Sequence, residues 1–170
     1  AIKIFLFVLA SFLLTTCNRN ENKNTMFEVL DADKTGLHFT NSLRSTQEFN
    51  MFDYMYFYNG AGIGAGDFNK DGLIDLFFAS NQGENKLYLN KGKLNFNDVT
   101  KEAQIPEDSA WSTGVSLVDI NNDGLLDIYV CRVGNYKTLH SKNQLLICQG
   151  IDKNGVPFFK DEATQYGLDF

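Results

Sequence analysis

Two nine-residue loops carry the residues best suited to chemistry in this sequence. Each has the pattern Asp-x-Asn-x-Asp-Gly-x-x-Asp, beginning at Asp67 in the first and at Asp119 in the second. Oxygen atoms at alternate loop positions can converge on one cation, because the glycine permits a sharp turn. The atoms would come from Asp67, Asn69, Asp71, Leu73 and Asp75, and from Asp119, Asn121, Asp123, Leu125 and Asp127, with the two leucines supplying backbone carbonyls.

The expected cation is Ca²⁺, with one ion in each loop. Calcium takes about six to eight oxygen ligands, and it suits a flexible cage better than Mg²⁺ does. Each loop also has three carboxylates that would repel one another without a cation. An EF-hand is unlikely on this pattern, because Phe78 and Val130 stand where its bidentate glutamate is needed. The alternative is a tight turn in which Asp, Asn and Gly serve only the backbone.

The two loops belong to a longer sequence repeat, since Asp67 and Asp119 are 52 residues apart. Each copy has a small or apolar run before the loop, a β-rich run after it, and then two further strand-like segments. The second copy gains six residues before its third segment, an insertion expected in a turn. Units of about 50 residues with four short strands indicate β-propeller blades.

Glycines alternate just before the first loop, at Gly60, Gly62, Gly64 and Gly66. Their period of about two places them on one face of a strand. Glycine in a strand interior suggests that another backbone comes close, as it does near the axis of a propeller. The run is not a dinucleotide-binding fingerprint, because Ala65 occupies the position of the third glycine.

We therefore expect an all-β fold with about two four-stranded, calcium-loop β-propeller blades. The first blade is assigned to residues 62–104, and residues 105–170 hold the second blade and the start of a connection to a third. Residues 35–61 are expected to form a lead-in strand. Two blades cannot close a ring, and a third loop at the same spacing would begin beyond Phe170. We expect the chain to be a fragment of a longer repeat protein.

Aromatic residues alternate along the expected lead-in strand, at Phe52, Tyr54, Tyr56 and Tyr58. They could stack against sugar rings, but packing on the first blade is the favoured interpretation. Trp111 could likewise line a binding face or pack between blades, and packing between blades is favoured. Cys131 and Cys148 fall on neighbouring expected strands, where either a disulfide or two buried free thiols would be possible.

The first 17 residues predict export from the cell. The run from Ile2 to Leu14 is almost wholly apolar behind Lys3. It is too short for a membrane-spanning helix, so a signal peptide is favoured over a buried helix. Residues 14–17 resemble a bacterial lipobox with Cys17 as the lipidated residue, although Thr16 departs from its pattern; an ordinary cysteine after a conventional leader is the alternative. Residues 18–34, which begin with the polar stretch 18–24, are expected to be a flexible tether.

The net charge bears on the class of partner. It is −6 at pH 7, which argues against nucleic acid, whose binding proteins need clustered lysine and arginine.

The paired loops resemble the FG-GAP/VCBS repeat family, whose Asp-x-Asn-x-Asp-Gly-x-x-Asp loops bind calcium in β-propeller blades. Residues 56–60 and 85–92, taken with the first loop, are similar to exported proteins that join VCBS repeats to an ASPIC/UnbV domain, often lipoproteins of Bacteroidetes. The likeness covers residues 35–170. It implies a seven-bladed propeller displayed at the outer membrane or cell surface of a Gram-negative bacterium, with an adhesion-like role.

Two functions follow as expectations. The first is a non-enzymatic, calcium-binding surface scaffold that binds a glycan or an extracellular protein. The alternative is a fragment of a polysaccharide-degrading enzyme of the lyase type, with its active site outside or only partly inside this chain. The sequence has no His-Glu-x-x-His or Gly-x-Ser-x-Gly motif, and His38 and His140 are expected at surface or turn positions. We therefore expect no catalytic residues here.

Overall fold

The computed structural model describes residues 26–170. The predicted signal peptide, the lipidation site Cys17 and residues 18–25 of the predicted tether lie outside the described residues. The chain divides into a unit of residues 1–30 and a unit of residues 31–170, and the second holds every feature described below. Among the described residues, no helix is long and apolar enough to cross a membrane.

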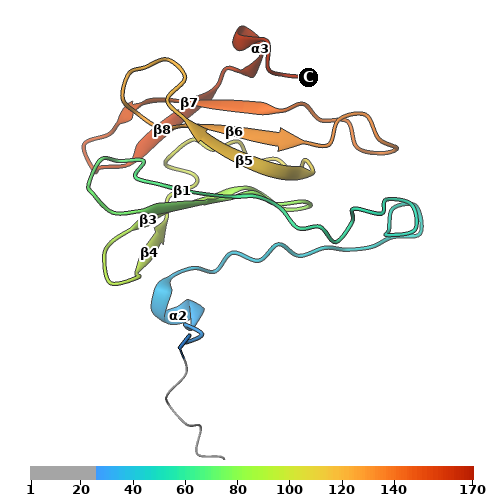
Figure 1. Ribbon diagram of the computed structural model, residues 1–170, viewed down its shortest axis with the longest axis horizontal. Coiled ribbons are helices and arrows are strands. Elements are labelled where there is room, and N and C mark those ends of the chain that lie inside the picture. Colours follow the sequence, from blue (N-terminus) through green and yellow to red (C-terminus); the bar gives the residue numbers. More distant parts are fainter. Residues whose placement is uncertain (1–25) are drawn as a thin grey trace, which may run out of the picture. The chain divides into compact units, whose positions relative to one another are not determined.

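Two four-stranded antiparallel sheets form the body of the second unit (Figure 1). Strands adjacent in sequence are also neighbours in the sheet, so each sheet is a simple meander. This confirms the predicted all-β fold with two four-stranded units, as in successive propeller blades. The first sheet contains β1 (Ile63–Gly66), β2 (Asp75–Phe78), β3 (Lys86–Asn90) and β4 (Phe96–Asp98), and the second contains β5 (Ser112–Val118), β6 (Asp127–Arg132), β7 (Gln144–Ile151) and β8 (Pro157–Asp161).

The main hydrophobic core is shared by the two sheets. Phe77 and Leu87 of the first sheet and Ile128 and Leu146 of the second are fully buried in the same cluster. Burying each such side chain contributes roughly 1.5–3 kcal/mol. A single sheet would leave this face in water, so each sheet depends on the other for its stability.

The glycines before the first loop allow the two sheets to approach closely. A Cβ atom on Gly62 would lie 2.6 Å from the backbone nitrogen of Val115, and one on Gly66 would lie 2.7 Å from a methyl carbon of Leu126. The predicted close approach is therefore found, and the neighbour is the second sheet. The expectation for Gly60 was wrong, because it lies outside β1, has a φ of 80° and meets no atom within 4 Å.

The predicted lead-in strand over residues 35–61 is absent: residues 36–46 have no regular structure, and residues 47–59 make bends and turns. Side-chain oxygens of Thr46 and Asn50 accept hydrogen bonds from the backbone of Phe49 (3.0 Å) and Phe52 (2.9 Å). Such local bonds compete with strand pairing. The favoured packing of the four alternating aromatic residues on the first blade is consequently not found: Tyr54 packs against Phe49 and Trp111, whereas Phe52 is 93% exposed and Tyr58 64% exposed.

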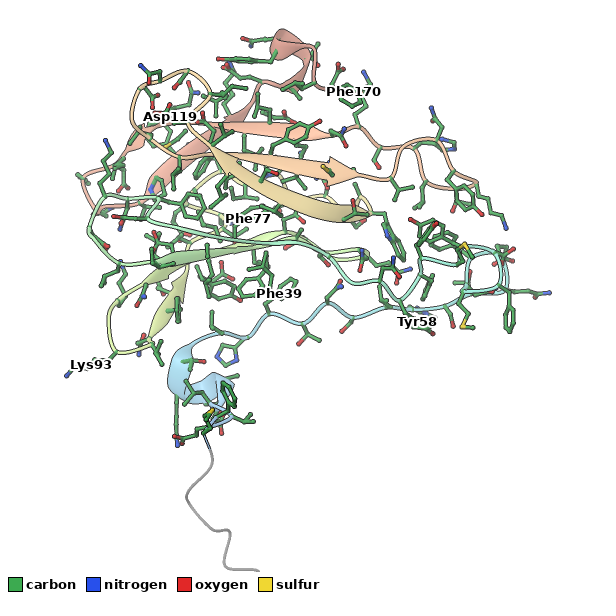
Figure 2. The ribbon with its side chains drawn as sticks, viewed as in Figure 1. Phe39, Tyr58, Phe77, Lys93, Asp119 and Phe170 are labelled. Atoms are coloured by element: carbon green, nitrogen blue, oxygen red, sulfur yellow. The ribbon has the colours of Figure 1, made fainter. Side chains whose placement is uncertain are left out.

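The segment before these turns packs along the first sheet. The helical turn α2 (Ala32–Thr35) is capped by the Asp31 carboxylate and ends at Gly36, so residues 32–34 of the predicted tether have regular structure. Phe39 then stacks on Phe78 of β2, with ring centroids 4.8 Å apart. Figure 2 shows Phe39 on this side of the first sheet. The second helical turn, α3 (Ala163–Tyr166), follows β8.

Cys131 and Cys148 are free thiols. The pairing of β6 with β7 places Val130 opposite Gln144 and Ile128 opposite Leu146. Cys131 lies just beyond the first of these pairs and Cys148 beyond the second, at opposite ends of the ladder. A disulfide needs Cα atoms within about 7 Å, so the two cysteines cannot be bridged without rearranging the sheet.

Candidate metal loops

The two Asp-rich loops connect β1 to β2 and β5 to β6, as the sequence predicts. In the first loop, Asp67 accepts hydrogen bonds from the backbone of Asp71 (3.1 Å) and Gly72 (2.9 Å) through its two carboxylate oxygens. Asn69 Oδ1 also accepts from the Asp71 backbone, at 3.2 Å, and Asp71 Oδ1 accepts from Leu73 at 2.9 Å. Side chains at the first, third and fifth positions therefore hold the loop in a tight curve by accepting hydrogen bonds from its own backbone.

The second loop repeats this arrangement bond for bond. Asp119 accepts from Asp123 (3.0 Å) and Gly124 (2.8 Å), Asn121 accepts from Asp123 (3.0 Å), and Asp123 accepts from Leu125 (2.7 Å). Each distance is within 0.2 Å of its counterpart in the first loop. Matching sequence has produced matching geometry at two places in the fold.

Backbone conformation explains the glycine at the sixth position of each loop. Gly72 has a φ of 86° and Gly124 a φ of 83°, as the sequence predicts, and side chains disfavour this region. The fourth position is also left-handed, with a φ of 59° at both Lys70 and Asn122. Sequence reasoning missed this second position. The signal was the asparagine of the second loop, a residue that tolerates the conformation well.

The ninth position has a structural role that the sequence analysis did not foresee. Asp75, fully buried at the start of β2, accepts hydrogen bonds from Phe68 in the loop (3.0 Å) and from Asn90 at the end of β3 (2.8 Å). One carboxylate therefore joins the loop to two strands. In the second sheet, Asp127 does the same with Ile120 (3.0 Å) and Cys148 (2.8 Å).

Burial raises the pKa of the Asp75 carboxyl, while its two backbone hydrogen bonds lower it. The neighbouring carboxylates of Asp71 and Asp67 raise it further. The pKa of the Asp127 carboxyl shows the same effects: burial raises it, the backbone hydrogen bonds lower it, and the carboxylates of Asp123 and Asp119 raise it. The acids of each loop are thus close enough to repel, and a bound cation would relieve that repulsion.

The chemistry of the donors fits calcium, because every candidate ligand in both loops is an oxygen atom. A carboxylate oxygen that accepts one N–H keeps a further lone pair for a cation. Within residues 26–170, however, no three carboxylate, imidazole or thiolate groups stand close enough together to hold a metal ion as they are placed. The hydrogen bonds within the loops are those that a tight turn also makes, and calcium binding stays a prediction.

Comparison with known proteins gives these loops a family context. Residues 67–130 match the FG-GAP-like repeat family. The match begins at the first residue of the first loop and ends inside β6, so both loops fall within this FG-GAP-like region. The repeat part of the resemblance inferred from the sequence is thereby supported. Its likeness to bacterial lipoproteins stays a prediction.

The chain is also similar to cartilage acidic protein 1 from several animals. It is 33% identical to the Xenopus tropicalis protein over 106 residues, which cover 62% of this chain and 15% of that relative. The Mus musculus and Homo sapiens proteins are each 31% identical over 81 residues, covering 48% of this chain and 12% of theirs. The chain thus spans less than a sixth of the length of these relatives.

An aromatic cluster lies away from the FG-GAP-like loops, where residues 47–61 meet the loop 133–143. Trp111 is buried at its centre, with ring centroids 5.2 Å from Phe49 and 5.3 Å from Phe57. Trp111 therefore packs against the turns before the first sheet, in a cluster separate from the core between the sheets. Figure 2 shows Tyr58 and Asp119 at opposite ends of the two sheets.

The insertion in the second repeat builds part of this cluster. Loop 133–143 contains it, as the sequence predicts, and Tyr136 places its ring 5.2 Å from that of Tyr54. The Tyr136 hydroxyl donates to the backbone carbonyl of Asp53, and Lys137 forms an ion pair with the Asp53 carboxylate. The inserted loop therefore supports the aromatic cluster through the contacts of Tyr136 and Lys137.

A pocket of about 420 Å³ opens on this cluster. Its walls include the rings of Tyr54, Tyr56 and Trp111 together with the polar residues Asn59 and Thr113. The histidines contribute nothing to it: His38 lies on the segment before the turns and His140 on loop 133–143, where its ring contacts Asn135.

Proposed function

We propose that this chain belongs to a calcium-stabilised, non-enzymatic repeat scaffold that is exposed at the cell surface and binds a glycan or an extracellular protein. The observation that carries the proposal is the repeated loop. Two FG-GAP-like loops share one hydrogen-bond pattern, and each ends in a buried aspartate tied to its sheet. Such repetition favours a structural role over a single reaction centre.

Calcium would act on the sheets through the aspartate at the ninth position. In the first loop the ion would be held by Asp67, Asn69, Asp71, the Leu73 carbonyl and Asp75, and the second loop would use the five equivalent residues. A bound cation supplies positive charge beside acids that otherwise repel. Because Asp75 and Asp127 also hold their strands together, relief of this repulsion would stabilise both sheets.

Exposed apolar side chains near the aromatic cluster support the binding role. Phe52 is 93% exposed, Met55 is 77% exposed and Tyr58 is 64% exposed. Three large apolar side chains exposed within seven residues would favour an interaction site if they form one patch on the surface. Aromatic rings beside polar groups suit both protein anchors and sugar rings.

Attachment to the outer membrane through Cys17 completes the proposal. It rests on the lipobox resemblance of residues 14–17 and lies outside the described residues. A diacylated cysteine would give stable anchoring, because two acyl chains bind a bilayer much more firmly than one. Metabolic labelling with palmitate tests the anchor, and loss of label in Cys17→Ser is the expected result.

Thermal unfolding of the full chain tests calcium binding. The protein is stripped with a chelator and then melted with and without added Ca²⁺, and with Mg²⁺ as the control ion. We expect a calcium-dependent rise of several degrees that Mg²⁺ reproduces poorly. Equal melting temperatures under all three conditions would rule out the calcium proposal.

Ligand screening tests the binding role separately. The full chain is applied to a glycan array while polysaccharides incubated with it are assayed for unsaturated sugar products. Stable capture without product release is expected of a scaffold. Product release without capture would favour the lyase alternative instead.

A further inference from the structure

The pocket of about 420 Å³ on the aromatic cluster, the Tyr56 pocket, lies where residues 54–61 meet Trp111 and the first residues of β5. Three of its seven lining residues are aromatic, Tyr54, Tyr56 and Trp111, and none of the seven carries a formal charge. Its volume falls within the ~300–1,000 Å³ typical of small-molecule sites. The pocket therefore has the size and the composition of a site for a neutral ligand.

The ring of Tyr56 is the accessible aromatic surface of this pocket. Tyr56 is 55% exposed, and its one ring contact within residues 26–170 is with Tyr54, at a centroid distance of 5.7 Å and an interplanar angle of 71°. A T-shaped contact covers at most one face of a ring, so Tyr54 leaves a face of Tyr56 free. The faces of aromatic rings are electron-rich and attract the weakly positive C–H groups of a sugar ring. Tyr56 thus offers a stacking platform.

The rings beneath this platform are held in place by one another. Tyr54 contacts Phe49, Trp111 and Tyr136, with ring centroids 5.7, 5.6 and 5.2 Å away. Trp111 is only 2% exposed, so the floor of the pocket is continuous with the buried aromatic cluster. A site whose side chains are already ordered loses less conformational entropy when a ligand binds.

Two exposed polar side chains stand beside the platform. The backbone N–H of Asn59 donates to the carbonyl of Tyr56 at 3.1 Å, which holds the Asn59 amide close to the ring in the chain turn. Thr113 is the extra residue of a bulge in β5, a feature that commonly redirects a side chain. Its hydroxyl donates to the carbonyl of Cys131 at 3.2 Å, and its oxygen can still accept a hydrogen bond.

The lining narrows the class of ligand. No lining residue could compensate a formal charge, so an acidic or basic ligand would lose hydration without gaining an ion pair. The net charge of −6 further disfavours phosphate-bearing ligands. A wholly apolar ligand would exclude water from Asn59 and Thr113 and give them no hydrogen bonds in return. A neutral sugar combines an apolar C–H face with hydroxyl groups that both donate and accept.

We propose that the Tyr56 pocket binds a neutral sugar residue of a glycan. The C–H face of the sugar stacks on the Tyr56 ring, and its hydroxyl groups form hydrogen bonds with the Asn59 amide and the Thr113 oxygen. This inference rests on the proposed glycan-binding role, and it gives that role a place in the fold and a class of ligand.

Fluorescence titration of the full chain tests the pocket directly, because Trp111 is the only tryptophan in the sequence. Methyl glycosides of glucose, galactose, mannose and N-acetylglucosamine are added singly. Glucuronic acid, glucosamine and a short neutral peptide containing phenylalanine are the comparison probes. The backbone amide NMR signals of Asn59 and Thr113 are followed in parallel, so that a sugar that leaves the fluorescence unchanged is still detected. We expect at least one neutral sugar to give a saturable response and to bind about tenfold or more tighter than the comparison probes.

Matched variants at two neighbouring tyrosines locate the response. Tyr56→Ala removes the platform and should raise the dissociation constant about tenfold or more, whereas Tyr56→Phe keeps the ring and should stay within about threefold. Tyr58→Ala is the control, because Tyr58 is 64% exposed but does not line the pocket, and it should leave the dissociation constant unchanged. Both tyrosines are more than half exposed, so the melting temperatures should stay close to that of the unmodified protein.

Several outcomes would overturn the inference. They are the absence of any response to the neutral sugars, binding of the charged sugars or of the peptide as tight as that of the neutral sugars, and equal losses in Tyr56→Ala and Tyr58→Ala. The titration of the unmodified protein decides even if a variant fails to fold. A glycan array that captures Tyr56→Ala as well as the unmodified chain would remove the Tyr56 pocket and keep the proposed function. An empty array together with an empty titration would remove the glycan-binding role as well.

Discussion

The side-chain amide of Asn69 donates a hydrogen bond of 3.2 Å to the backbone carbonyl of Gly155. Asn69 is the third residue of the first loop, and Gly155 lies in the turn between β7 and β8 of the other sheet. The same amide donates to Asp71 within its own loop, at 3.0 Å. One side chain thus connects a candidate metal loop to the neighbouring sheet.

This relationship predicts different effects for one substitution at two equivalent positions. Asn69→Asp keeps an oxygen at the third position but removes the amide donor. In the metal-free protein it should therefore lower the free energy of unfolding by about 1 kcal/mol or more. Asn121→Asp loses only the bond to Asp123 within its loop and should cost less. Urea unfolding with a chelator present measures both. Equal destabilisation would show that the contact with Gly155 contributes nothing.

The buried aspartates predict a second pair of effects. Asp75→Asn retains one acceptor oxygen but places an NH₂ group against a backbone donor, either that of Phe68 or that of Asn90. The free energy of unfolding should fall by about 1–3 kcal/mol, the usual cost of an unsatisfied buried polar group. Asp127→Asn should behave alike, because its two backbone partners are equivalent. Denaturant unfolding checks both variants, and a stability equal to that of the unmodified protein would refute the role assigned to this carboxylate.

Close packing of the two sheets predicts that Gly62→Ala is costly. The added methyl group would lie 2.6 Å from the Val115 backbone nitrogen, which cannot move independently of β5. Overpacking of this kind costs about 1–3 kcal/mol. Gly134→Ala is the matched control, because its nearest atom would be an ordinary 3.7 Å away. Thermal melting compares the two, and a small effect at Gly62 would mean that the sheets separate readily.

The left-handed backbone at the fourth loop position predicts opposite effects on stability for two substitutions. Lys70 and Asn122 both have a φ of 59°, a region that lysine tolerates less well than asparagine. Lys70→Asn should therefore stabilise the protein by a few tenths to about 1 kcal/mol, and Asn122→Lys should destabilise it by a similar amount. Melting curves recorded in chelator isolate the backbone effect from any metal. Changes of the same sign would contradict it.

Much of the fold was predictable because it depends on local pattern. The two loops, the left-handed glycines at Gly72 and Gly124 and the four strands of each unit all follow from residues close together in sequence. The lead-in strand was predicted wrongly for a related reason. Alternating aromatics from Phe52 to Tyr58 suggested a strand, but the side chains of Thr46 and Asn50 bond to the backbone and turn the chain.

The sequence by itself determined the repeat, the donor atoms of the loops and the conformations that their glycines require, since these depend on residue type and spacing. Only the tertiary structure decided what these elements touch. The bond from Asn69 to Gly155 spans 86 residues, and the ion pair of Arg132 with Asp108 ties the end of β6 to the segment before β5. Contacts of this kind arise when two sheets bury a common core, and no local pattern specifies which atoms then meet or which stay without partners.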